Sequence, residues 1–436
     1  MNNYHDPREF IRGLQQILIS DSKRIGFLCG AGTSMAAEMR DKDGKVVYQD
    51  EKKIKAQPLI PGIKKMTENI INNIEGTDYK AALAIIKEEL EEAEHNNNLK
   101  LSTFMLENII SSINLKIKGI GRGNLCGLNK EKLISLRDYI QKEIKKVVSV
   151  HDNPKIKLQT EDFLYSTLAT WIINASRKDP VEIFTTNYDY LFEIGFESRN
   201  LPYFDGFVGS YNPFFDPVSV ENDLLIPQWT RLWKLHGSLG WEYDKDEKKI
   251  IRSRKSDDDG IVIYPSLLKY DDSRKQPYVS YLDRLCSFIK KDDGVLFICG
   301  YSFGDEHINE AIVNSLSQSK SSTVYAFIYD NQIDENSPVI NVGKRSKKMQ
   351  ICANKVALIG GVFGDWKLKR EPAKEDFDFI DQYFDRDAPI PLKDKGKNDE
   401  QSVLTGLMKL TDFKQFTSFL LSLTYPSNTE NDNRKN

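Results

Sequence analysis

Short apolar runs that alternate with helical segments constrain the fold of this chain more than any other feature. The strand-like runs beyond residue 180 are VEIFTTNYD, RLWKLHGSLGWEY, GIVIYP, GVLFICGYS, STVYAFIYD and KVALIGG. Amphipathic segments such as YVSYLDRLCSFIKK and DEHINEAIVNSLS separate several of them. Because helices are the usual crossovers between parallel strands, this alternation predicts an α/β fold with a mostly parallel sheet.

A long helical stretch interrupts the alternation. The segment RIGFLCGAGTS predicts a first buried strand that ends in a glycine turn, but from about residue 62 to about residue 176 the apolar spacing is mostly helical. We therefore predict a main domain over residues 1–366 that carries a helical insertion at about 62–176. Residues 367–436 are predicted to form a C-terminal helical extension with a disordered tail.

The last amphipathic segment, SVLTGLMKLTDFKQFTSFLLSLT, predicts a helix that is too apolar to stand alone in solvent. This helix either packs against its own domain or offers a surface to a partner or to a second copy of the chain. The sequence favours neither alternative over the other.

Charge and cysteine usage narrow the functional class. The 61 basic and 64 acidic side chains give a formal net charge of -3, which predicts no direct binding of nucleic acid. No apolar run approaches the length that crosses a bilayer, so no contact with a membrane is expected. The 5 cysteines are scattered and form no C-x-x-C pair, which suits a cytoplasmic protein in a reducing compartment.

Polar residues and glycines follow several predicted strands, at the strand ends where open α/β sheets bind ligands. The turn GAGTS at residues 30–34 would let backbone amides approach a pyrophosphate, although such turns also occur without any ligand. In TTNYD, the residues Thr186, Asn187 and Asp189 either bind a ligand or form a turn in which Asp189 caps the next helix.

Two further strand ends carry candidate residues. His236 in KLHGS is either a satisfied polar residue or a proton acceptor that works near neutral pH. In GYSFGDEHINEAI, Gly300 and Ser302 are candidates for contact with a nucleotide. Asp305 is expected to cap the following helix, and His307 is expected to lie on that helix's surface.

In their order and spacing these four elements resemble those of the sirtuin, or silent information regulator, superfamily, and particularly its bacterial anti-phage branch. GAGTS matches the family's GAG-x-S loop, TTNYD its T-x-N-x-D element, KLHGS its histidine-glycine element and GYSFGD its later G-x-S loop. The resemblance covers residues from about 24 to 40 and from about 183 to 361. It implies a Rossmann-like sheet that binds NAD as a substrate.

The resemblance also implies a role for individual residues. Asn187 and Asp189 would hold the nicotinamide ribose and the carboxamide, Asn187 would also position the attacking water, and His236 would be the general base. The residues expected to bind NAD are Gly30, Ala31, Gly32, Thr33, Ser34, Thr186, Gly300 and Ser302.

Two departures from the deacylases of this superfamily narrow the expected activity. The chain lacks the paired C-x-x-C motifs of a structural zinc site, so no metal is expected. It also carries MAAEMRDKDGK where deacylases have a proline-aspartate-phenylalanine-arginine loop. We therefore expect an NAD glycohydrolase that releases nicotinamide and ADP-ribose. The alternatives are a zinc-free deacylase or ADP-ribosyltransferase and, from another class, a non-catalytic sensor of NAD or ADP-ribose.

The anti-phage branch implies a setting for this activity: depletion of NAD in an infected cell, gated by a partner or by a phage component. A HerA-type translocase ATPase is the partner that the resemblance implies, with an Argonaute-type protein as the alternative. Self-assembly into a homo-oligomer, through the helical insertion or the C-terminal helix, is also expected.

Overall fold

A computed structural model describes residues 3–53, 55–96, 104–175, 177–244, 246–253, 276–369, 382–386 and 406–424 of the chain. The predicted strand GIVIYP and the predicted disordered tail lie outside these residues.

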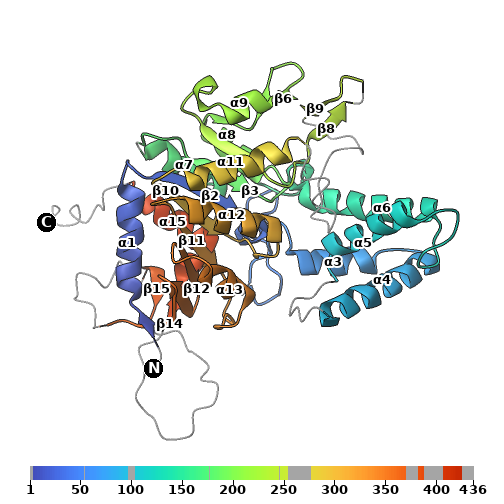
Figure 1. The fold of residues 1–436 in the computed structure, drawn as a ribbon, viewed down its shortest axis with the longest axis horizontal. Coiled ribbons are helices and arrows are strands. Elements are labelled where there is room, and N and C mark those ends of the chain that lie inside the picture. Colours follow the sequence, from blue (N-terminus) through green and yellow to red (C-terminus); the bar gives the residue numbers. More distant parts are fainter. Residues whose placement is uncertain are drawn as a thin grey trace, which may run out of the picture.

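A ten-stranded sheet lies at the centre of the protein (Figure 1). Seven of its neighbouring pairs are parallel, and only β13 runs antiparallel to both of its neighbours. This topology confirms the predicted α/β fold with a mostly parallel, Rossmann-like sheet. From edge to edge the strands are β1 (Tyr4–His5), β14 (Val362–Trp366), β13 (Val356–Ile359), β12 (Met349–Ala353), β11 (Thr323–Ile328), β10 (Gly294–Cys299), β2 (Arg24–Cys29), β3 (Glu182–Thr185), β7 (Thr230–Lys234) and β4 (Tyr203–Phe204).

Helices cover both faces of this sheet and give it two hydrophobic cores. Successive residues of a strand point to opposite faces, so Phe27 and Cys29 belong to one cluster while Leu28 belongs to the other. Burial on both faces explains why the central strands are almost continuously apolar in the sequence. The first cluster includes α1 (Pro7–Ile19), α7 (Leu164–Asn174), α8 (Leu191–Ser198) and α15 (Phe413–Ser422); the second includes α11 (Tyr278–Lys290), α12 (Glu306–Gln318) and α13 (Pro338–Lys344).

Two strand assignments depart from the parallel pattern expected from the sequence. KVALIGG does form a strand, β13, but only two residues separate it from β12, and so short a connection produces an antiparallel pair. The end of RLWKLHGSLGWEY leaves the main sheet and forms β8. The smaller antiparallel sheet around β8 contains β5 (Phe207–Val208), β6 (Phe214–Phe215), β9 (Lys249–Arg252) and β8 (Trp241–Asp244), with α9 (Pro217–Glu221) and η2 (Asp223–Leu225) nearby in the chain.

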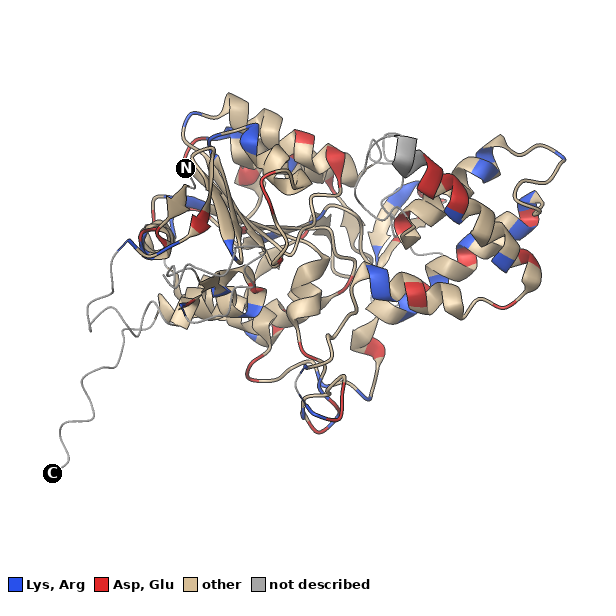
Figure 2. Ribbon diagram, turned by 90° about the horizontal axis from the view of Figure 1, so that it is seen from below, with Lys and Arg blue, Asp and Glu red and all other residues tan. Residues whose placement is uncertain are grey.

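The helical insertion forms a lobe that projects to one side of the sheet (Figures 1 and 2). Basic and acidic side chains are interspersed along its helices. The chain returns to the sheet with α7, which packs against α8 and α15. Its helices are α3 (Ile63–Asn72), α4 (Thr77–Asn96), α5 (Leu106–Gly119) and α6 (Lys130–Val148), followed by η1 (Val150–Asp152).

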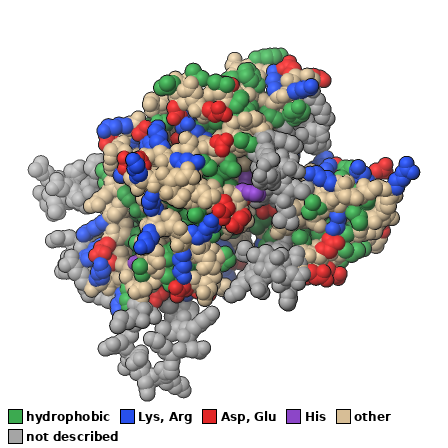
Figure 3. All heavy atoms as spheres, viewed as in Figure 1, with side chains coloured by type: hydrophobic (Ala, Val, Ile, Leu, Met, Phe, Trp, Pro, Cys, Tyr) green, Lys and Arg blue, Asp and Glu red, His purple; other side chains and the backbone are tan. Residues whose placement is uncertain are grey.

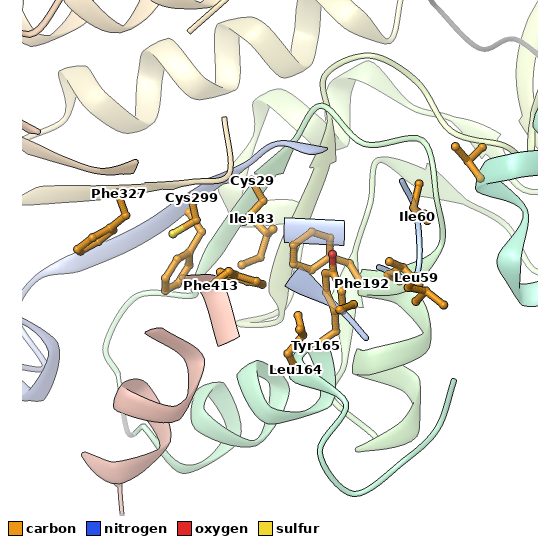
Figure 4. Packing of buried hydrophobic residues seen from close by; sticks show 14 of the residues in the cluster. Cys29, Leu59, Ile60, Leu164, Tyr165, Ile183, Phe192, Cys299, Phe327 and Phe413 are labelled. Atoms are coloured by element: carbon orange, nitrogen blue, oxygen red, sulfur yellow. The ribbon is translucent and has the colours of Figure 1, made fainter. Parts of the chain in front are cut away.

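The C-terminal helix packs against its own domain. Phe416 of α15 lies among the rings of Phe27 and Phe297, at centroid distances of 6.3 and 5.7 Å. Figure 4 shows Phe413 on the same side of the strands as Cys29. The predicted helix is too long, because Asp412 accepts the Lys414 N–H at 2.8 Å and fixes the helix start. Before it lie η3 (Lys409–Thr411) and β16 (Leu407–Met408), which pairs with β15 (Phe384–Asp385).

None of the helices within the described residues is long and apolar enough to cross a membrane. On the face drawn in Figure 3, basic and acidic side chains are interspersed, as the small net charge suggests.

Helix α1 contains a glycine that packing does not require. A Cβ atom at Gly13 would meet nothing within 4 Å, and glycine inside a helix is less favourable than alanine by about 0.5–1 kcal/mol. We expect Gly13→Ala to raise the free energy of unfolding by about that amount, measured from urea unfolding midpoints. An unchanged or lower midpoint would show that the backbone at this position is under a constraint that alanine cannot meet.

Candidate active site

The strand register brings the four candidate segments to one edge of the sheet. Cys29, the last residue of β2, pairs with Cys299 on one side and with Thr185 on the other, and Thr185 pairs with Lys234. Four neighbouring strands therefore end at the same level. The segments that follow them carry all of the residues that the sequence singles out, and α2 (Ala31–Ala36) begins directly after β2.

The loops that follow β2 and β10 are in direct contact. The Gly32 N–H donates to the Gly300 carbonyl at 2.8 Å. A Cβ atom on Gly32 would lie 2.6 Å from the Gly300 Cα, and one on Gly300 would lie 2.4 Å from the Thr33 nitrogen. Gly300 also has a φ of 62°, a conformation that favours glycine. The glycines thus allow the two loops to pack closely. Their contact with a cofactor stays a prediction.

Asn187 is held by the turn at residues 30–34. Its Nδ2 lies 3.1 Å from the Gly30 carbonyl oxygen, 3.2 Å from Thr33 Oγ1 and 3.0 Å from Ser34 Oγ. The side chain is buried, and among the described residues no hydrogen bond reaches its Oδ1. Three acceptors thus orient the amide, with its nitrogen toward the turn and its oxygen directed elsewhere.

Asp189 supports this arrangement from inside the protein. Its Oδ2 accepts the Ser34 hydroxyl at 2.9 Å, and its Oδ1 accepts the Leu191 N–H at the start of α8 at 3.1 Å. Burial raises the pKa of Asp189, and the nearby charge of Lys234 is the largest opposing influence. The contact with the first turn of α8 agrees with the capping alternative, while the contact of Asp189 with a carboxamide stays a prediction.

His236 and Asp305 form a pair between the ends of β7 and β10. Nε2 of His236 lies 3.0 Å from Oδ2 of Asp305, and the imidazole is 13% exposed. The other oxygen of Asp305 accepts the N–H groups of His307 and Ile308 at 3.0 and 3.4 Å, which confirms the predicted cap of α12. Since a carboxylate only accepts hydrogen bonds, Nε2 carries the proton and Nδ1 is the nitrogen left to accept one.

The remaining candidate residues lie around this centre. Thr186 is half-buried and its N–H donates to the Cys29 carbonyl at 3.1 Å. Ala31 and Ser302 are exposed at the sheet edge, and Ser302 Oγ accepts the Gly304 N–H at 3.3 Å. His307 is exposed on α12, as predicted.

Sequence reasoning missed three residues that shape the site. Tyr165 comes from α7 (Figure 4). Its hydroxyl lies 3.3 Å from both Thr33 Oγ1 and Ser34 Oγ. Thr185 Oγ1 donates to the Cys29 carbonyl at 2.9 Å and accepts the Asn187 N–H at 3.0 Å. Lys234 is a buried cation. Only Lys234 gives a local signal, a lysine inside the otherwise apolar run RLWKLH.

Within the described ranges, no group of three or more His, Cys, Asp or Glu side chains is arranged to hold a metal ion. All five cysteines are free thiols. Burial raises the pKa of the Cys299 and Cys352 thiols, which is typical of unreactive, structural cysteines.

Comparison with known protein families gives a match to part of the chain. Residues 181–352 match the family of SIR2-like domains. The matched stretch contains Asn187, His236 and Gly300, whereas the turn at residues 30–34 precedes it and joins the site only in the fold. A search of curated proteins finds no match to the chain. A SIR2-like domain implies an activity that uses NAD. This SIR2-like match supports the resemblance of the chain's motifs to those of the sirtuin superfamily.

Proposed function

We propose that the protein is an NAD glycohydrolase, which breaks the bond between nicotinamide and ribose. The observation that supports the proposal is that an oriented Asn187 and a His236–Asp305 pair follow the ends of two neighbouring strands. Asn187 lies two residues after Thr185, and His236 lies two residues after Lys234, the strand partner of Thr185. Two polar side chains of complementary function therefore leave neighbouring strands at the same level.

The proposed reaction needs a fixed ribose, an attacking water and a base. The water oxygen bonds to the anomeric carbon of the ribose while the bond to the nicotinamide nitrogen breaks, and nicotinamide leaves with the electron pair. The carbonyl oxygen of Asn187 accepts a hydrogen bond from the ribose or from the water. Nδ1 of His236 takes the proton that the water loses, which contributes roughly 10²–10⁴-fold to the rate. Asp305 holds the ring and stabilises the imidazolium that forms.

The proposed NAD-binding set extends along the edge of the sheet. Ala31 and Ser302 are its exposed members, and Thr33 and Ser34 are buried behind Asn187. The small side chains and glycines there suit the approach of a phosphate-bearing ligand to the backbone. The full proposed set is Gly30, Ala31, Gly32, Thr33, Ser34, Thr186, Gly300 and Ser302.

Further parts of the proposal concern the cell and come from the resemblance alone. Cleavage would deplete NAD during phage infection, in the cytoplasm, under the control of a partner or a phage component. The proposed partner is a HerA-type ATPase, with an Argonaute-type protein as the alternative, and the chain would assemble as a homo-oligomer.

The activity is tested by incubating the purified protein with NAD, alone and with the product of the neighbouring gene, and separating the products by chromatography. Equal amounts of nicotinamide and ADP-ribose are expected. Transfer of labelled ADP-ribose to protein, or nicotinamide release only with an acylated peptide, would replace the hydrolase by a transferase or a deacylase. Binding of NAD without release under either condition would favour a sensor.

Two substitutions of Asp305 separate its role as a helix cap from the role of its charge. Asparagine caps helices as well as aspartate does, so Asp305→Asn is expected to keep the thermal midpoint. It removes the charge beside His236, and we expect NAD cleavage to fall on the order of 10²-fold or more. Asp305→Ala loses the cap as well, and this loss lowers the free energy of unfolding by ~1 kcal/mol.

Asp216 supplies the matched control, because it caps α9 through the Ser219 N–H at 3.2 Å. Asp216→Asn is expected to leave both the thermal midpoint and the cleavage rate unchanged. Full cleavage by Asp305→Asn would show that this carboxylate serves only the helix.

A further inference from the structure

Lys234, the last residue of β7, lies buried in an ion pair. Its side chain is 3% exposed, and Nζ forms an ion pair with Glu193 Oε1 at 2.7 Å. Nζ also donates to the Asp189 carbonyl oxygen and to Ser238 Oγ, the latter at 3.2 Å. A buried ammonium group is costly unless such partners surround it. We therefore ask what the Lys234 side chain contributes at this position.

These contacts join the two segments that carry the proposed reacting groups. The Asp189 carbonyl belongs to the turn that begins with Asn187, and Ser238 belongs to the loop that begins after His236. The backbone of Lys234 is itself paired with Thr185 in the sheet. One side chain thus fixes the turn and the loop relative to each other, directly behind the site.

The charge of Lys234 also acts on Asp189. As a carboxylate, Asp189 accepts the Ser34 hydroxyl, and the Ser34 oxygen then accepts from Asn187 Nδ2. Lys234 lowers the pKa of Asp189 against the effect of burial. The other titratable groups that face this carboxylate are Glu193 of α8, which opposes its charge, and the neutral phenol of Tyr165. Among these groups only Lys234 favours the anion.

We propose that Lys234 is a positioning residue for NAD cleavage: its charge keeps Asp189 in the form that orients Ser34 and Asn187, and its contacts hold the Asn187 turn against the His236 loop. This inference rests on the proposed function. It makes the geometry of the reacting centre depend on a side chain that lies outside that centre.

Lys234→Met tests the inference together with a rescue variant and a control. Lys234→Met leaves Glu193 buried without its partner, and a loss of stability is expected. Lys234→Met/Glu193→Gln removes both charges and is expected to recover most of the thermal midpoint. The control is Lys348→Met, because Lys348 is half-buried and its Nζ donates to carbonyls at the end of α12, such as that of Leu316 at 3.2 Å.

The double variant is expected to cleave NAD about 10²-fold more slowly than the natural protein, since displacement of a reacting group by about 1 Å has effects of that size. In Lys234→Met, the acid limb of the kcat/KM profile is expected at higher pH. Without Lys234 the pKa of Asp189 rises. The Asp189 carboxylate is then protonated at a higher pH as the solution is acidified, so the acid limb shifts upward. Lys348→Met is expected to shift neither the rate nor the limb.

A double variant with the natural kcat would overturn the inference, and a lowered thermal midpoint beside that kcat would reduce Lys234 to a structural residue. An acid limb that does not move in Lys234→Met would overturn the part played by its charge. Failure of the natural protein to release nicotinamide, alone or with the neighbouring gene product, would instead overturn the proposed function and the inference with it.

Discussion

Replacement of His236 by alanine is expected to reduce NAD cleavage by about 10²–10⁴-fold, because the variant lacks the group that takes the proton from water. Binding of NAD should change much less, since the imidazole is proposed to act on the water and not on the nucleotide phosphates. The loss is therefore expected in kcat, with KM nearly constant, in initial-rate measurements of nicotinamide release.

The control for this variant is His307→Ala. His307 lies two residues after Asp305, but its side chain is exposed on the surface of α12. We expect the His307→Ala variant to cleave NAD at the natural rate. If His236→Ala retained the full rate, another group would have to accept the proton, and the pair with Asp305 would be structural.

Replacement of Gly300 by alanine is expected to disrupt the site through the backbone. The new Cβ atom would lie 2.4 Å from the Thr33 nitrogen, so the loops after β2 and β10 would have to separate. The positive φ of 62° adds about 1–2 kcal/mol of strain. We expect a lower thermal midpoint and a loss of cleavage of roughly 10²-fold or more, because Thr33 and its neighbour Ser34 orient Asn187.

A substitution of Gly360 separates the effect of backbone strain from the effect of a steric clash between the loops. Its φ of 61° nearly equals that of Gly300, but a Cβ atom there would meet nothing within 4 Å. Gly360→Ala should therefore lose about 1–2 kcal/mol of stability and keep its activity. Equal losses of activity in the two variants would contradict the importance of the contact between the loops.

The sequence predicts the edge of the sheet better than the interior of the site. Glycine and polar residues after buried strands locate Asn187, His236 and Gly300, because strand ends are a local property of the chain. The partners of these residues are not local. Nothing near Tyr165 indicates that α7 returns to contact the turn at residues 30–34, and the cap at Asp305 gives no sign of its second contact with His236.

The errors in the fold have local causes. The strand β12, MQICA, is short and contains a glutamine, so apolar pattern alone did not mark it as part of the sheet. The final helix starts later than its apolar pattern suggests because Asp412 caps it, and a local hydrogen bond of this kind overrides periodicity.

The insertion of a whole lobe between β2 and β3 has a consequence for synthesis. Asn187 and Gly30, which share a hydrogen bond, are 157 residues apart in the chain, and Asp305 follows much later still. Folding that depends on contacts of such separation is slow. A ribosome that has not passed β10 holds a chain without Gly300 or Asp305, so a nascent or truncated product has an incomplete centre. The proposed cleavage of NAD therefore requires that translation has passed β10 and the loop that follows it.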